Sequence, residues 1–90
     1  MVKVNFTSAL KRFFPELRSI LVEAKDIAEV IDKVEEQFPG MKSYVLDDAG
    51  RLRKHVNIFI GEDLIQDETA LKDAVGDHAE VHIFQALSGG

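Results

Sequence analysis

The chain has 90 residues, of which 46% are apolar and 30% are charged, with a formal net charge of -5 and no cysteine. This length suits one domain, and the composition is typical of a soluble globular protein. The lack of cysteine excludes disulfides, thiolate metal sites and thiol nucleophiles. The acidic balance argues against a nucleic-acid partner, because such binding depends mainly on Lys and Arg contacts to phosphate.

The first two predicted elements are strands. Residues 2–6 alternate apolar and polar side chains, which is typical of a strand with one buried face. After an irregular stretch over residues 7–18, the run 19–23 has the β-branched content of a second strand, which we expect to pair with the first as a hairpin. The N-terminus lacks the charged-then-apolar order of a signal peptide, and no apolar run approaches the roughly 18 residues of a membrane helix. We therefore expect a cytoplasmic protein that does not bind membranes.

A helix is predicted next. Asp26 stands in an N-cap position, and Glu29 three residues later completes a capping-box-like start. The apolar residues that follow form one stripe at helical spacing: Ile27, Val30, Ile31, Val34 and Phe38. Pro39-Gly40 ends the helix.

The second half of the chain is predicted to be mainly β. Residues 41–46 favour a short helical turn, and residues 47–50 a loop. The run 56–60 is the strongest strand candidate. A polar segment over residues 61–75 leads to a turn at Gly76-Asp77. The last predicted strand follows this turn and is Glu80-Val81-His82-Ile83-Phe84.

Together these elements predict an α+β fold with a mixed sheet and one main helix packed across one face. This is the economical way to cover all the apolar stripes, and it is the β-grasp, or ubiquitin-like, arrangement. We expect the β-grasp domain to occupy residues 1–85. Because no core pattern remains after Gln85, residues 86–90 are predicted to form a flexible C-terminal tail.

The chain ends in Ser88-Gly89-Gly90. Two residues without side chains let backbone enter a narrow active-site tunnel, because glycine has no Cβ and accepts almost any backbone angle. The reactive group is then the α-carboxylate of Gly90, which becomes a good electrophile only when one oxygen is made a leaving group. A chance Gly-Gly is the alternative, expected in about one chain in 200. Since cysteine is absent, any sulfur carried by the protein must be held at Gly90.

With these features the chain resembles the sulfur-carrier family that includes the molybdopterin synthase small subunit (MoaD) and the thiamine sulfur carrier (ThiS). The resemblance covers essentially all 90 residues, and the terminal Gly-Gly is its specific element. The other elements that support the resemblance are the strand 2–6, the helix unit 26–40, the stretch 56–61, the turn Gly76-Asp77 and the strand 80–84. Two departures leave the pathway open: a long, basic loop between Met41 and His55, and Ala86-Leu87-Ser88 before the Gly-Gly.

The resemblance implies that the protein is not an enzyme and binds no cofactor. An E1-like adenylating enzyme of the MoeB/ThiF type would adenylate Gly90 with ATP and Mg²⁺, and sulfur from a donor would then replace AMP to give a thiocarboxylate. A sulfur-accepting partner would use that sulfur to build a small molecule. The candidate acceptors are the molybdopterin synthase large subunit, a cysteine synthase and a thiazole synthase.

Partner-binding residues are predicted on the sheet and in the tail. Strand alternation turns Phe59 and Phe84 away from the core, and an outward aromatic pair is a candidate docking patch for the activating enzyme. The structural alternative is that one of them packs on a loop or on Leu87. In the tail, Leu87 and Ser88 are predicted to contact the partner beside Gly89 and Gly90.

Other polar features are weaker. His55, His78 and His82 do not have the spacing that brings imidazoles together, so no metal site is expected. The acids of residues 62–80 are interpreted as a solvated face, with a basic partner surface as the alternative. The basic run Arg51-Leu52-Arg53-Lys54 is interpreted as keeping a loop soluble, with an acidic rim on a partner as the alternative.

Two other functions fit the same sequence. The first is a protein modifier, in which activated Gly90 is joined to lysines of other proteins. The second is a non-conjugating β-grasp binding module, for which the terminus is incidental.

Overall fold

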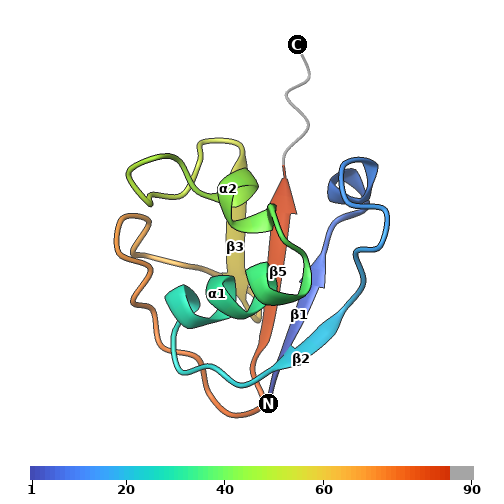
Figure 1. Ribbon diagram of the computed structural model, residues 1–90. Helices are drawn as coiled ribbons and strands as arrows, with labels where there is room; N and C mark the ends of the chain where they lie inside the picture. Colours follow the sequence, from blue (N-terminus) through green and yellow to red (C-terminus); the bar gives the residue numbers. More distant parts are fainter. Residues whose placement is uncertain (86–90) are drawn as a thin grey trace.

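A computed structural model describes residues 1–85 as a five-stranded mixed sheet with helices on one side (Figure 1). The strand order across the sheet is β2-β1-β5-β3-β4. The elements in chain order are β1 (Val2–Phe6), the 3-10 helix η1 (Ser8–Arg12), β2 (Ile20–Val22), α1 (Ile27–Gln37), α2 (Met41–Val45), β3 (Val56–Ile60), β4 (Asp63–Leu64) and β5 (Glu80–Gln85). The predicted α+β, β-grasp fold is confirmed.

The sheet is built around the central strand β5. It pairs in parallel with β1, where Val4 is opposite Val81, and antiparallel with β3, where Ile58 is opposite Ile83. The strand β1 also pairs antiparallel with β2, with Val4 opposite Ile20, so the predicted hairpin is confirmed. The first and last strands of the chain are therefore neighbours at the centre of the sheet.

The helix α1 begins as the sequence predicts. The Asp26 carboxylate accepts a hydrogen bond from the Glu29 backbone N–H at 2.9 Å. The Glu29 carboxylate reaches back and accepts from the backbone N–H of Lys25 at 3.0 Å, one residue before the cap that a standard capping box would use. The helix ends at Gln37, and Phe38 leaves the helical conformation because it precedes Pro39.

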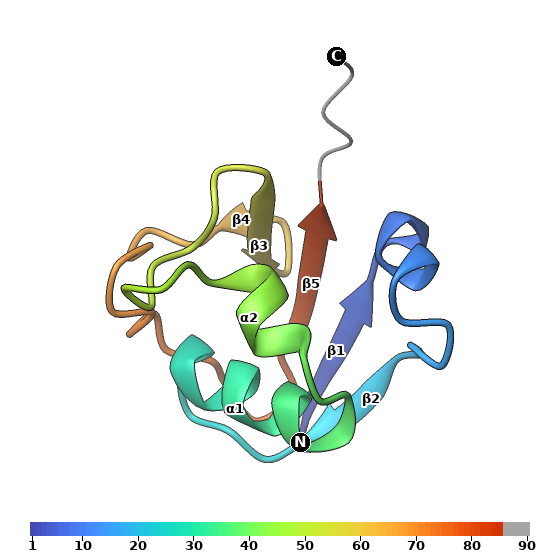
Figure 2. The same cartoon turned by 45° about the horizontal axis from the view of Figure 1, so that its top comes forward.

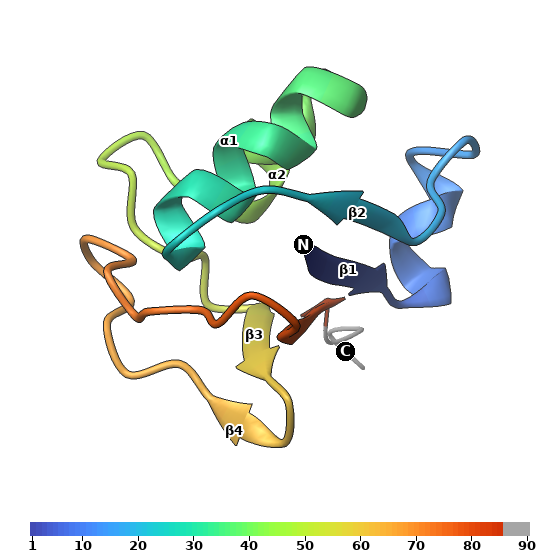
Figure 3. The ribbon, with the colours of Figure 1, turned by 90° about the horizontal axis from the view of Figure 1, so that it is seen from below.

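The core lies between the helices and the inner face of the sheet. Seen along the strands, α1 and α2 lie on the same side of the sheet (Figure 3). The apolar stripe of α1 is buried, and Phe38 remains 5% exposed although it is outside the helix. Four of the residues predicted to face the core from β3 and β5 are buried: Val56, Ile58, Val81 and Ile83. The fifth, Ile60, is partly buried against the core.

Two short elements were not predicted. Residues 8–12 form η1 within the stretch expected to be irregular, and Asp63–Leu64 form the edge strand β4 within the segment expected to be polar. Both are too short for a periodic pattern to appear in the sequence. The strand β4 exists because the chain turns back at Gly61, which has a positive φ of 62°, and pairs with β3.

The segment after β4 is ordered by two aspartates. The Asp67 carboxylate accepts hydrogen bonds from the backbone N–H groups of Thr69, Ala70 and Lys72. The Asp73 carboxylate accepts hydrogen bonds from the backbone N–H groups of Gln66 and Asp67. The hydrogen bond from Ala70, followed by that from Lys72, lowers the pKa of Asp67 to about 2. These bonds hold the segment so that Ile65 and Leu71, at its two ends, are buried.

Residues 1–85 contain no helix long and apolar enough to cross a membrane.

Candidate functional site

The end of β5 lies where several segments meet. Gln85 is opposite Val56, the first residue of β3, and η1 follows directly after β1, the other neighbour of β5. The segments 8–16 and 47–55, together with Gln85, will be called the Gln85 end. Figure 2 shows η1 and the long loop before β3 on either side of the end of β5. The predicted tail continues the chain from this point.

Gln85 is fixed from two sides. Its backbone N–H donates to the Thr7 hydroxyl at 3.3 Å, and its side-chain oxygen accepts from the Tyr44 hydroxyl at 3.1 Å. Tyr44 in turn packs against Phe13 and Phe14, with ring centroids 5.1 and 5.6 Å away. The root of the tail is therefore anchored to β1 and α2. No sequence pattern indicates this arrangement, because Thr7, Tyr44 and Gln85 are far apart in the chain.

The two aromatic residues predicted to face outward lie side by side on the sheet. The ring centroids of Phe59 and Phe84 are 5.4 Å apart, and Phe84 is 41% exposed. They lie on neighbouring strands, with Phe59 opposite His82 and Phe84 opposite Asn57. The prediction that these rings point away from the core is confirmed. Their role in docking remains a prediction.

Two further residues extend this aromatic pair. Leu64 on β4 is opposite Phe59 and is 47% exposed, and the His82 ring lies 6.2 Å from the ring of Phe84. Phe59, Phe84, Leu64 and His82 will be called the outer patch. Alternation along β5 places His82 on this face, but Leu64 was missed because β4 has only two residues.

His82 is held by polar neighbours on the same face. Its Nδ1 lies 3.4 Å from Asn5 Nδ2, and its Nε2 lies 3.7 Å from a carboxylate oxygen of Glu80. Within residues 1–85, no group of three or more His, Asp and Glu side chains is arranged to hold a metal ion. His82 therefore lies on the outer face between the aromatic ring of Phe84 and the polar side chains of Asn5 and Glu80.

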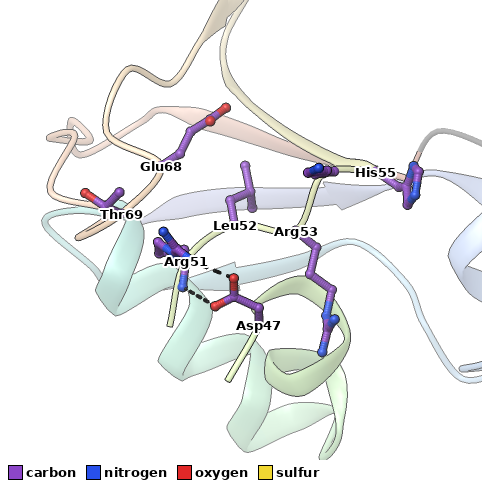
Figure 4. Close-up of a pocket in the computed structure, with 8 residues that line it drawn as sticks. Asp47, Arg51, Leu52, Arg53, His55, Glu68 and Thr69 are labelled. Atoms are coloured by element: carbon purple, nitrogen blue, oxygen red, sulfur yellow. Dashed lines mark hydrogen bonds and ion pairs between the residues drawn. The ribbon is translucent and has the colours of Figure 1, made fainter. Parts of the chain in front are cut away.

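A hollow of about 540 Å³ lies between the loop before β3 and the segment after β4 (Figure 4). Its lining includes Arg51, Arg53 and Lys54 from one side and Glu68 from the other, all of them exposed. The hydrogen bond from the Arg51 backbone N–H lowers the pKa of Asp47, which also lies 3.7 Å from Arg51 Nε. This open, mixed-charge hollow is a depression between loops and has no buried polar group to hold a ligand.

The remaining predicted site residues lie outside the part of the chain that the structure describes. These residues are Leu87, Ser88, Gly89 and Gly90.

Comparison with known families gives a match over most of the chain. The model described as the ThiS family matches residues 8–90, which include η1, every strand after β1 and both terminal glycines.

Comparison with individual proteins gives distant relatives of the same length. The sulfur carrier protein CysO of Mycobacterium tuberculosis is 24% identical, with 99% of this chain and 98% of the relative covered. A chain in the crystal structure of the Amycolatopsis orientalis BexX/CysO complex has a TM-score of 0.85 at 22% identity, with both chains fully covered. The small archaeal modifier protein 1 of Methanosarcina acetivorans has a TM-score of 0.78 at 20% identity, covering 99% of this chain and 95% of that one. These structures share the fold.

Proposed function

This chain belongs to the ThiS family, and from that premise we propose that it is a cytoplasmic sulfur carrier with Gly90 as its reactive terminal residue. The protein acts as the substrate of a partner enzyme and performs no chemistry alone. The observation that supports this most is the family match, because it continues past the folded domain to Gly89 and Gly90.

The proposed chemistry has two balanced steps. The Gly90 carboxylate attacks the α-phosphorus of ATP bound with Mg²⁺ on an adenylating enzyme, which forms an acyl-adenylate and releases pyrophosphate. Sulfide then attacks the acyl carbon and displaces AMP, which leaves a thiocarboxylate on Gly90. With sulfide as donor the exchange needs no reductant.

The outer patch is the proposed docking surface for the adenylating enzyme. Phe59 and Phe84 are in contact, and exposed aromatic clusters often anchor protein interfaces. In the tail, Leu87 and Ser88 are proposed to contact the enzyme's channel, and Gly89 to pass its narrowest part, since glycine has no Cβ. From Gln85 to Gly90 the chain extends at most about 20 Å, so docking of the domain and entry of the tail are compatible.

The test is intact-mass spectrometry of the full chain after incubation with an adenylating enzyme from the same genome, ATP, Mg²⁺ and sulfide. We expect one oxygen to be exchanged for sulfur, and no exchange after deletion of Gly90 or in the variant Gly89→Ala/Gly90→Ala. The matched control is Gly76→Ala, because a Cβ at Gly76 meets no atom within 4 Å. Lack of exchange in the wild type, or exchange that persists without Gly90, contradicts the proposal.

The sulfur acceptor is proposed to be a cysteine synthase, since the curated relatives are named CysO. A molybdopterin synthase large subunit and a thiazole synthase are the other candidates from the family. Each purified acceptor should be incubated with the thiocarboxylated protein and with that enzyme's own sulfur-accepting substrate. The correct one will transfer the sulfur to its substrate, and water will cleave the acyl–sulfur bond and return the carboxylate on Gly90.

Conjugation to proteins is the second candidate function, favoured by the similarity in fold to a small archaeal modifier protein. It predicts that trypsin digestion leaves C-terminal peptides of this chain, residues 73–90, joined to lysines of other proteins, because Lys72 is the last Lys or Arg in the sequence. Their absence from cells that express the chain, together with thiocarboxylate formation, leaves sulfur transfer as the function.

A further inference from the structure

The Gln85 end is basic in a protein of net charge -5. Its segments 8–16 and 47–55 contain five Lys and Arg against three acids. The cations lie on both sides of Gln85: Lys11, Arg12, Arg51, Arg53 and Lys54. All five are exposed. Positive charge therefore surrounds the point from which the tail continues.

Most of these cations are not used by the fold. Among residues 1–85, the ion pairs of lysine involve Lys25, Lys33 and Lys42, all near α1 or α2. At the Gln85 end only Arg51 has an ion-pair partner, Asp47. Lys11, Arg12, Arg53 and Lys54 have none within the described chain, and of these only Arg53 makes a side-chain hydrogen bond, to the Ser43 carbonyl at 3.2 Å.

The opposite end of the sheet carries the opposite charge. There β3 turns into β4 and the chain enters β5, through segments 61–63 and 76–80. These segments contain four acids and no Lys or Arg: Glu62, Asp63, Asp77 and Glu80. This end stays acidic when Lys3, which is opposite Glu80, is included. The molecule is therefore a dipole along its strands, with the positive pole at the Gln85 end.

The tail limits which partner surface can meet the positive pole. If the tail is inserted into a catalytic channel, the mouth of that channel lies within about 20 Å of Gln85. During approach, a dipole of this kind turns the correct end toward an oppositely charged surface, and the effect weakens as salt screens the charges. Unpaired surface cations contribute little to the stability of the fold. The presence of several such cations at the Gln85 end therefore favours a role in contact with another molecule.

We propose that Lys11, Arg12, Arg53 and Lys54 bind an acidic rim at the mouth of the adenylating enzyme's channel. They steer the tail into that channel while the outer patch docks beside it. This inference rests on the proposed function. The inference adds the charge of the partner surface and the residues of this chain that recognise that surface.

The experiment compares two variants with the same change in net charge. Lys11→Glu/Lys54→Glu reverses one cation on each side of Gln85, and neither side chain makes a hydrogen bond or ion pair in the described chain. Lys33→Glu/Lys72→Glu reverses two exposed or partly exposed cations on and beside α1. The rate of thiocarboxylate formation is measured for each at carrier concentrations from limiting to saturating, at about 0.05 M and about 0.5 M NaCl, a range over which screening becomes strong. Thermal unfolding checks that both variants fold.

We expect kcat/KM for Lys11→Glu/Lys54→Glu to fall about tenfold at low salt, with kcat nearly unchanged and the loss much smaller at high salt. The control Lys33→Glu/Lys72→Glu should stay within about twofold of the wild type. Equal losses in both variants, or no loss in either, overturn the inference while thiocarboxylate on the wild type keeps the proposed function. If the wild type itself forms no thiocarboxylate, the proposed function and the inference both fail.

Discussion

On the inner face of the sheet Ile58 and Ile83 are fully buried, whereas the next residues along the same strands, Phe59 and Phe84, lie on the outer face, where Phe84 stays 41% exposed. Ile58 and Ile83 are directly opposite each other on neighbouring strands, and Phe59 and Phe84 are diagonal neighbours on the same two strands. Strand geometry alone therefore does not distinguish these two apolar pairs. The difference comes from the helices, which cover one face only. An apolar group that the fold leaves uncovered is free to bind a partner.

The largest expected effect separates the inner face from the outer one by stability. Replacing Ile58, which is 0% exposed, with Ala should lower the free energy of unfolding by about 2–5 kcal/mol, because it removes buried methyl groups and leaves a cavity. Urea unfolding followed by circular dichroism measures the change. A loss below about 1 kcal/mol, which is typical of surface substitutions, would show that the two faces do not differ as described.

The next test separates the faces by function. Phe84→Ala should reduce kcat/KM for thiocarboxylate formation at least tenfold, as loss of an aromatic interface anchor does, with little change in the free energy of unfolding. The control is Leu21→Ala on the edge strand β2, since Leu21 is 60% exposed but lies outside the outer patch. If Leu21→Ala slows the reaction as much as Phe84→Ala, apolar area in general, and not the outer patch, is responsible.

A smaller effect is expected from weakening the layer that covers the inner face. Asp26→Ala removes the side-chain cap of α1 and should cost about 1 kcal/mol of stability. Glu36→Ala, on the exposed side of the same helix, is the control and should change stability less. Chemical denaturation at neutral pH measures both. Equal stability of Asp26→Ala and the wild type would mean that the cap contributes nothing.

The smallest effect concerns the segment that closes the inner layer beside β4, and it depends on pH. Because the pKa of Asp67 is lowered from 3.8 to about 2 in the folded protein, its contribution to stability is present above pH 3.8 and is lost as the pH falls through about 2. Asp67→Asn should therefore be less stable than the wild type at neutral pH, and the difference should vanish near pH 2. Urea midpoints over a pH series measure it.

The control for this titration is Asp77→Asn. Asp77 is exposed and its carboxylate accepts no hydrogen bond within residues 1–85, so its replacement should change stability at neutral pH less than Asp67→Asn does. A difference for Asp67→Asn that persists unchanged at pH 2 would show that the side chain acts through something other than its charge.

Much of the fold was predictable because it depends on local patterns. The capped helix α1 and the strand β3 have the predicted boundaries within one residue, since a cap, a stripe and a run of alternating residues each lie in one continuous segment. The strand β4 and the helix η1 were missed because their few residues carry no periodic pattern. They exist through a glycine turn and through packing onto neighbouring segments.

The same distinction holds for the candidate site. The sequence indicated the terminal Gly-Gly, the outward direction of Phe59 and Phe84, and the basic run before β3, each from adjacent or alternating residues. It did not indicate that Tyr44 and Thr7 hold Gln85, or that Lys11 and Lys54 lie on opposite sides of it. Those arrangements depend on the pairing of β5 with both β1 and β3, and the first of these pairings brings together residues nearly 80 positions apart.

By itself the sequence determined the class of fold and the outward direction of the aromatic pair, and it led to the proposal that Gly90 carries the chemistry. Only the tertiary structure decided which apolar face stays uncovered and where the charges gather around the end of β5. The physical reason is that secondary structure follows the order of neighbouring residues, whereas a surface is assembled from segments that meet only when the core is formed.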